Sequence, residues 1–288
     1  MDILINLFIF CLILFIYVHV YYNIKTSNYL EVYEIDNPSK EKFEELCNLK
    51  QPLVINNFPI IDKTFNLEYL NTNYKSFDVK IRNKENIELF LPIKLSKAVE
   101  LFDKDVSNSY ISEGNKDFLE ETTIEKIFNT NDLLLRPYNI SNIEYDLIFG
   151  SLNSYTPLRY NLNCRNILYL NNGSVEITLA PPKNYKYLCV KNYYEHLEFI
   201  SSIDINNVQD FYKNDFDKVK LLRIVLKENS LIQIPPYWFY SIKIIEKNTL
   251  IFSFKYRTYM NTLSIFPQLF IKFLQENNIK INMTKIIK

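Results

Sequence analysis

The sequence is short of histidine and glycine, and both shortages limit what the protein can do. Its 288 residues include two histidines, His19 and His196, and three glycines. A site that needs two imidazole ligands would have to use both histidines, and a glycine-rich phosphate loop has too few glycines to form. The basic and acidic residues balance at 33 each. No block of one sign stands out, which disfavours a nucleic-acid partner.

The four cysteines and the common catalytic motifs give no support for an enzyme. Cys47, Cys164 and Cys189 lack the spacing of a metal site and suit free thiols in a reducing compartment. Neither Gly-x-Ser-x-Gly nor Cys-x-x-Cys occurs, so a serine hydrolase or a dithiol redox enzyme has no support. The abundance of Asn, Ile, Lys and Tyr is typical of an A/T-rich coding sequence, and it points to a parasite, a symbiont or a large DNA virus.

The chain begins with a long, uncharged apolar run from Ile3 to Tyr22. About 20 residues at a rise of about 1.5 Å each are long enough to cross a hydrocarbon core of about 30 Å. No basic segment precedes the run and no small-residue cleavage site follows it, so we interpret residues 1–24 as a transmembrane anchor rather than a signal peptide. His19 lies among tyrosines at the expected membrane interface, and Lys25 beyond it favours a cytosolic soluble domain.

The soluble part, residues 25–278, changes its pattern near residue 145. The stretch 31–144 mixes helical and strand patterns, such as a helix after Ser39 and a strand at 52–57. From 145 to 258, short apolar runs separated by polar turns predict the strands of a β-sandwich or barrel. The expected strands cover residues 145–149, 166–170, 174–179, 221–226, 230–234, 239–245 and 249–256.

Two local signals predict a hairpin and a closing helix. Asn171-Asn172-Gly173 stands between two of the apolar runs and predicts a tight hairpin, because Asn and Gly accept positive φ angles. A C-terminal helix is expected over residues 259–278, where Leu269, Phe270, Phe273 and Leu274 share one face. That face either packs on the domain's own sheet or contacts a protein partner, including a second copy of the chain. Residues 279–288 are interpreted as a tail.

Three segments, in this order, resemble the cupin-like JmjC proteins, the branch that includes asparaginyl and lysyl hydroxylases. They are Gln51–Phe58, the stretch Leu147–Pro182 with Thr156-Pro-Leu-Arg-Tyr-Asn161 inside it, and Ser230–Ile244 with Ile234-Pro-Pro-Tyr-Trp238 at its centre. The likeness covers residues 31–278. It implies a double-stranded β-helix, mainly β with flanking helices, that follows the N-terminal transmembrane helix.

The resemblance also implies where an iron centre would lie. The family holds Fe(II) with two histidines and one carboxylate and leaves positions open for 2-oxoglutarate and oxygen. The matching positions here are Arg159, Asn161 and Tyr240, and Val175 stands where a basic residue would pair with the cosubstrate. Arginine has no lone pair for a metal and keeps its positive charge, and amide and phenol groups are poor substitutes for the other ligands. We therefore predict no metal, no cofactor and no catalytic residues.

Two hypotheses for the function follow. The first is a membrane-anchored, catalytically inactive domain that acts by binding or as a structural component. Arg159 then predicts a small-anion pocket in place of the metal, unless it pairs with a neighbouring acid or aromatic side chains fill the space. The second is an active Fe(II)- and 2-oxoglutarate-dependent hydroxylase with an unusual ligand set. His196 is expected in solvent without a catalytic role. The residues predicted to line the pocket are Thr156, Arg159, Asn166, Trp238 and Tyr240.

Overall fold

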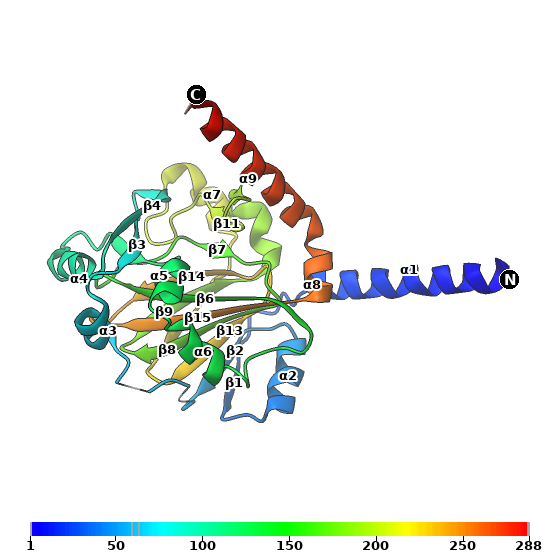
Figure 1. The fold of residues 1–288 in the computed structure, drawn as a ribbon, viewed down its shortest axis with the longest axis horizontal. Helices are drawn as coiled ribbons and strands as arrows, with labels where there is room; N and C mark the ends of the chain where they lie inside the picture. Colours follow the sequence, from blue (N-terminus) through cyan, green and yellow to red (C-terminus); the bar gives the residue numbers. More distant parts are fainter. Residues whose placement is uncertain (1, 59, 63, 287–288) are drawn as a thin grey trace.

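Two facing β-sheets form the centre of the computed structural model, which describes residues 2–58, 60–62 and 64–286 (Figure 1). Within these residues the larger sheet has nine strands in the order β1-β2-β13-β8-β15-β6-β5-β3-β4. The strands are β1 (Tyr33–Asp36), β2 (Leu53–Asn56), β3 (Asp78–Asn83), β4 (Asn86–Lys94), β5 (Tyr110–Ser112), β6 (Ile140–Gly150), β8 (Arg165–Asn172), β13 (Ser230–Ile234) and β15 (Leu250–Thr258).

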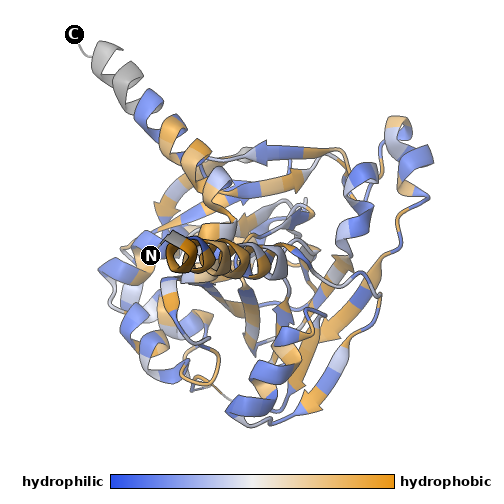
Figure 2. Ribbon diagram, turned by 90° about the vertical axis from the view of Figure 1, so that its right-hand side faces the viewer, coloured by the Kyte–Doolittle hydropathy of each residue, from blue (hydrophilic) through white to orange (hydrophobic). Residues whose placement is uncertain are grey.

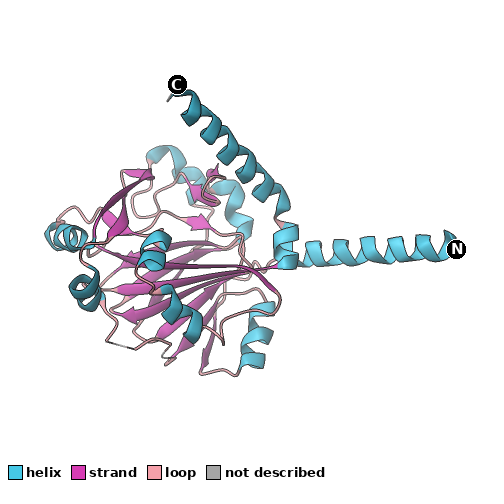
Figure 3. Cartoon of the chain, in the orientation of Figure 1, coloured by secondary structure: helices cyan, strands magenta, loops and turns pink. Residues whose placement is uncertain are grey.

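The smaller sheet has six strands among the described residues, in the order β10-β11-β7-β14-β9-β12. They are β7 (Arg159–Tyr160), β9 (Val175–Ala180), β10 (Val190–Tyr193), β11 (Glu198–Ser201), β12 (Leu222–Leu226) and β14 (Phe239–Ile244). Each of the seven strands predicted between residues 145 and 258 is present, with both ends within five residues of those expected. The prediction of a mainly β domain with flanking helices is confirmed (Figure 3).

Helices cover the outer faces and form both ends of the described chain. They are α1 (Asp2–Ile24), α2 (Lys40–Asn48), α3 (Leu67–Tyr74), α4 (Leu95–Lys104), α5 (Lys116–Glu121), α6 (Glu125–Asn131), α7 (Lys213–Phe216), α8 (Tyr259–Ser264) and α9 (Phe266–Ile286), with short 3-10 turns η1 (Pro182–Tyr187) and η2 (Asp210–Tyr212). Ser39 caps α2 as expected, because its side chain accepts a hydrogen bond from the Lys42 amide. Asn66 caps α3 in the same way through Tyr69.

The space between the sheets is apolar along most of its length. Successive strand residues point to opposite faces, so alternate residues of both sheets meet in this interior. The larger sheet contributes Leu168 and Ile232, and the smaller sheet contributes Ile177, Leu179 and Ile242. Burial of these side chains fixes the register of the strands, because a slip by one residue would turn them outward.

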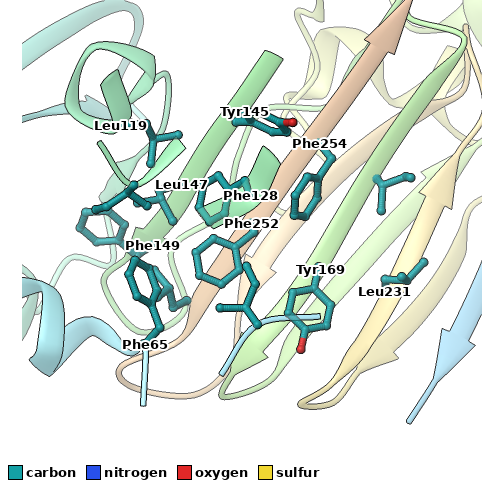
Figure 4. Packing of buried hydrophobic residues seen from close by; sticks show 14 of the residues in the cluster. Phe65, Leu119, Phe128, Tyr145, Leu147, Phe149, Tyr169, Leu231, Phe252 and Phe254 are labelled. Carbon is teal, nitrogen blue, oxygen red and sulfur yellow. The ribbon is translucent and has the colours of Figure 1, made fainter. Parts of the chain in front are cut away.

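A second core lies between the larger sheet and helices α2 to α6, and aromatic residues dominate it (Figure 4). The Phe128 ring on α6 lies 4.9 Å from the Phe252 ring on β15 and 5.7 Å from the Tyr145 ring on β6. Asp132 is buried beside them and accepts hydrogen bonds from the hydroxyls of Tyr145 (2.7 Å) and Tyr256 (2.6 Å). The helices of the first half therefore cover the outer face of the larger sheet, and we call the two facing sheets together the barrel.

The predicted hairpin at Asn171-Asn172-Gly173 is wrong. β8 pairs with β13 and β15 in the larger sheet, whereas β9 pairs with β14 and β12 in the smaller one. The three residues therefore make a sharp crossover between the sheets. Gly173 has φ +82, as the turn signal requires, and a Cβ there would lie 2.9 Å from Thr249 Cα.

Two helices project from the domain. Helix α1 is long and apolar enough to cross a membrane by length and composition, a test that a signal sequence also passes (Figure 2). Helix α9 runs to Ile286, so the helical segment is longer than the 259–278 predicted. Leu269 packs against the domain, but Phe270, Phe273 and Leu274 are exposed, so the four residues do not share one environment.

Candidate functional site

One cavity of about 590 Å³ brings the three predicted metal-site positions together at one end of the barrel. Arg159 and Tyr240 come from the smaller sheet, where β7 and β14 pair them directly. Asn161 follows β7, and the larger sheet supplies Lys255 from β15 on the opposite wall. The cavity therefore lies between the two sheets, beyond the apolar interior.

Asn161 and Tyr240 are joined to each other. The Asn161 Nδ2 amide donates to the Tyr240 hydroxyl at 2.9 Å, and the Asn161 carbonyl accepts from the Tyr237 amide at 3.0 Å. Tyr240 is buried, and the Arg159 guanidinium lies 5.6 Å from the centre of its ring. Because the phenol oxygen accepts this bond, its own proton remains available for donation into the cavity.

Arg159 belongs to a buried cluster of two arginines and two glutamates. Its Nη1 lies 2.9 Å from Glu113 Oε1 and 3.0 Å from Glu198 Oε1, and its Nη2 contacts Glu113 Oε2. Arg82 on β3 contacts the same two acids, at 2.9 Å to Glu113 and 2.7 Å to Glu198. We call Arg82, Glu113, Arg159 and Glu198 the ion-pair cluster. It connects β3, the segment after β5, β7 and β11, four pieces distant in sequence.

The cluster keeps its groups charged despite burial. Burial raises the pKa of Glu113, but Arg159 and Arg82 outweigh it and lower the pKa to about 2. Burial acts to lower the pKa of Arg159, and Glu113, Tyr240 and Glu198 together hold that pKa above its ordinary value. Each guanidinium is thus balanced by carboxylates at contact distance, the arrangement that makes buried charge tolerable.

This donor set does not fit an iron centre. Arg159 offers N–H donors and no lone pair, and the neutral amide of Asn161 is already bonded to Tyr240. In the described part of the chain, no group of three or more His, Cys, Asp or Glu side chains could hold a metal ion. The two carboxylates beside Arg159 serve as ion-pair partners. The chemistry of these side chains is hydrogen bonding and charge pairing.

The other predicted pocket residues lie elsewhere or serve structural roles. Thr156 lines a separate cavity of about 200 Å³, and its hydroxyl oxygen accepts from the Ile242 amide at 2.9 Å. Trp238 is fully buried, and its indole donates to the Ser27 carbonyl at 3.0 Å. Asn166 pairs across the sheet with Lys255, which places both on the same face. The assignment of these residues to one ligand site stays a prediction.

Three polar groups on that face have unused hydrogen-bonding capacity. Asn166 is buried, and neither its amide nitrogen nor its oxygen has a hydrogen-bond partner in the described residues. Ser253 is buried two residues before Lys255 on the same strand, and its hydroxyl likewise has none there. The Lys255 ammonium is partly buried and makes no hydrogen bond to the described chain. Burial opposes the charge of Lys255, but Tyr240, Glu144 and Asp146 outweigh it and raise its pKa.

Sequence reasoning missed Lys255 and the three other members of the ion-pair cluster. Lys255 and Ser253 interrupt the apolar run of β15 at alternate positions, which is a readable sign of a polar patch on one face. Arg82, Glu113 and Glu198 carry no such sign, because the ion pairs that the two glutamates make with Arg82 and Arg159 depend on tertiary structure. His196 is exposed as expected, at the rim of the cavity, with its ring 6.2 Å from the Phe90 ring.

The cavity as a whole is balanced in charge. Its lining carries five basic side chains and five carboxylates. The basic ones are Lys80, Lys116, Arg159, Lys255 and Lys272, and the acidic ones are Glu113, Glu144, Asp146, Glu195 and Glu198. A balanced, polar cavity of this size suits a small polar ligand better than a highly charged one.

Comparison with known proteins agrees with the architecture of facing sheets around an end cavity. A family model described as a cupin-like domain matches residues 38–261, which is most of the chain. No curated protein matches the sequence. The match starts just before α2, ends within α8 and includes every described strand except β1, together with most of the residues that line the cavity. The chain therefore belongs to the family of cupin-like, JmjC-type domains.

Proposed function

We propose that the protein is a membrane-anchored, catalytically inactive cupin-like domain whose end cavity binds a small carboxylate. The proposed lack of catalysis rests on one observation. The side chains at the family's metal positions are bonded to other groups of the protein. Arg159 is paired with Glu113 and Glu198, and Asn161 is bonded to Tyr240. Such side chains stabilise the end of the barrel and have no donor set to offer iron.

Polar groups in and beside the cavity suggest the class of ligand, since Lys255 lines the cavity and Asn166 and Ser253 are buried next to it. Lys255, Asn166 and Ser253 share one face and together present ammonium, amide and hydroxyl donors. Tyr240 adds a phenolic proton from the opposite sheet. Buried polar groups nearly always find a partner, so a bound group rich in acceptors would satisfy them. A carboxylate has this character, and Lys255 supplies a positive charge in the wall of the cavity.

The anchoring role rests on α1. Residues Ile3–Ile24 form one helix whose apolar side chains are almost all exposed. Twenty-two residues at about 1.5 Å each give about 33 Å, which matches a hydrocarbon core of about 30 Å. A bilayer would cover this surface, which the domain itself leaves bare.

Metal analysis of the full chain tests the inactive assignment. The protein is purified in detergent, incubated with Fe(II) without oxygen, desalted and measured for iron. We expect iron far below one atom per chain and no succinate release from 2-oxoglutarate. Stoichiometric iron that is lost in Asn161→Ala and Tyr240→Phe would instead support the hydroxylase hypothesis.

Thermal shifts test the ligand. Acetate, succinate, 2-oxoglutarate and glycine are titrated against the full chain, and a ligand that binds only the folded state raises its melting temperature. We expect a saturable rise with at least one of these carboxylates. Lys255→Met should abolish the rise, whereas Lys272→Met at the α9 side of the cavity should keep it. No rise with any carboxylate, or an equal rise in Lys255→Met, contradicts the assignment.

A further inference from the structure

The junction between α1 and the domain is held by several bonds, so the helix is not a loose tether. Lys50 Nζ donates to the Lys25 carbonyl at 2.9 Å and to the Tyr22 carbonyl at the end of α1, and it lies 3.9 Å from the centre of the Tyr22 ring. The Tyr22 hydroxyl donates to Asn48 Oδ1 at 3.2 Å. The chain after α1 is fixed as well, because the Ser27 amide donates to the Lys50 carbonyl at 3.3 Å.

Exposed aromatic and apolar residues surround this junction. Tyr22, Tyr138 and Tyr259 line one cavity of about 500 Å³ at the base of α1, and Tyr138 and Tyr259 are 67% and 66% exposed. Helix α8 packs against α1, and Leu263 lies one turn after Tyr259 on its exposed side. Figure 1 shows α8 where α1 leaves the domain. We call Tyr22, Tyr138, Tyr259 and Leu263 the junctional collar.

The length of α1 sets the depth of the collar in a bilayer. From Ile3 to Tyr22 the helix rises about 29 Å, close to the thickness of one hydrocarbon core. With Ile3 at one boundary, Tyr22 therefore reaches the other. Tyrosine is enriched at this depth, because its ring enters the apolar layer while its hydroxyl stays among the headgroups.

We propose that the junctional collar is a membrane-contact surface that seats the domain directly on the lipid headgroups. This inference rests on the proposed anchoring by α1 and goes beyond it. Because the junction is rigid, insertion of α1 brings Tyr138, Tyr259 and Leu263 to the bilayer surface together with Tyr22. The bilayer is favoured over a protein partner because the collar is continuous with the exposed apolar surface of α1.

Tryptophan fluorescence in vesicles tests the contact. The full chain is reconstituted in phosphatidylcholine vesicles as Tyr259→Trp, Leu263→Trp or Val106→Trp, each retaining the native, buried Trp238 as a constant background. Val106 is the matched control, because it is 94% exposed and follows α4, at the opposite end of the molecule from α1 in Figure 1. Phospholipids brominated near the glycerol end of the acyl chain serve as quenchers, and each variant must melt within error of the natural protein.

If the collar contacts the membrane, the tryptophan emission of Tyr259→Trp and Leu263→Trp should shift to the blue and be strongly quenched by the brominated lipids. The emission of Val106→Trp should be quenched no more than that of the natural protein. Equal signals from the three variants, in vesicles that keep the protein through an alkaline wash, overturn the membrane contact while the anchor stands. Release by the alkaline wash overturns the anchor itself. Quenching that falls as the protein-to-lipid ratio rises indicates that a second copy covers the collar, which also overturns the proposal.

Discussion

Replacing Arg159 with methionine tests how much the ion-pair cluster stabilises the end of the barrel. The substitution removes the contacts from Arg159 to Glu113 and Glu198, while Arg82 still reaches both acids. Breaking a buried ion pair costs about 3–5 kcal/mol, because it leaves a charge without compensation. Arg82 retains part of that compensation, so we expect a loss of about 3 kcal/mol, at the lower end of this range.

Thermal and denaturant unfolding of the full chain in detergent measure this loss. For a domain of this size, about 3 kcal/mol corresponds to a melting temperature lower by roughly 6–12 °C. The exposed pair between Lys97 and Glu100, 3.3 Å apart, provides the control. Lys97→Met should change the free energy of unfolding by less than about 1 kcal/mol, since exposed pairs contribute little.

The pH dependence gives an independent check. The pKa of Glu113 in the folded protein is about 2, below its ordinary value of 4.5. The folded state therefore holds this proton less tightly than the unfolded state, and ionised Glu113 stabilises the fold fully above pH 4.5 and progressively less as the pH falls toward 2. Without Arg159 the pKa of Glu113 rises, so acid unfolding should begin at a higher pH. If Arg159→Met is as stable as Lys97→Met and unfolds in acid at the same pH as the natural protein, the cluster contributes no net stability and the reasoning is refuted.

Two further substitutions test the framework. Gly173→Ala should lower the free energy of unfolding by about 1–3 kcal/mol or more, because alanine is strained at φ +82 and its Cβ would meet Thr249. Gly114→Ala should cost less, because Gly114 has a similar φ of +75 but its nearest contact would be at 3.7 Å. Equal losses for the two variants in urea titrations would contradict the clash at Gly173. Tyr256→Phe removes the 2.6 Å hydrogen bond to buried Asp132 and should lower the free energy of unfolding by about 1.5–3 kcal/mol. An unchanged midpoint of urea unfolding would show that this bond contributes nothing to stability.

The strands were predictable because burial imposes their pattern. β15 reads as an apolar run because one face packs under the helices and the other lines the barrel, and its predicted and observed ends differ by one to two residues. The positive φ angle of Gly173 was predictable, but the hairpin expected there does not form. A local signal fixes the bend of the chain, whereas the sheet that the next strand joins depends on partners far along the sequence.

Three residues of the cavity could be located from the sequence, but their contacts could not. The resemblance located Arg159, Asn161 and Tyr240, and the structure places them in one cavity. It gave no sign of Glu113, which lies 46 residues before Arg159 in a segment outside the family's metal motifs. Ion pairs between distant segments leave no periodic pattern in a sequence. Any of the 33 acidic residues could be the partner of Arg159, and the sequence does not say which.

The framework of this domain and the side chains at its end cavity depend on separate sets of residues. Alternating apolar residues such as Ile177 and Ile232 hold the sheets together whatever occupies the end of the barrel. The polar residues at the end of the barrel need partners of their own, because an unpaired guanidinium or amide at a buried site would cost several kcal/mol. Arg159 pairs with carboxylates and Asn161 is bonded to Tyr240, so protein groups meet this need at the end of the barrel. Lys255 lines the same cavity outside these pairs, with Glu144 and Asp146 acting on its charge, and it is the cation that we propose meets a ligand.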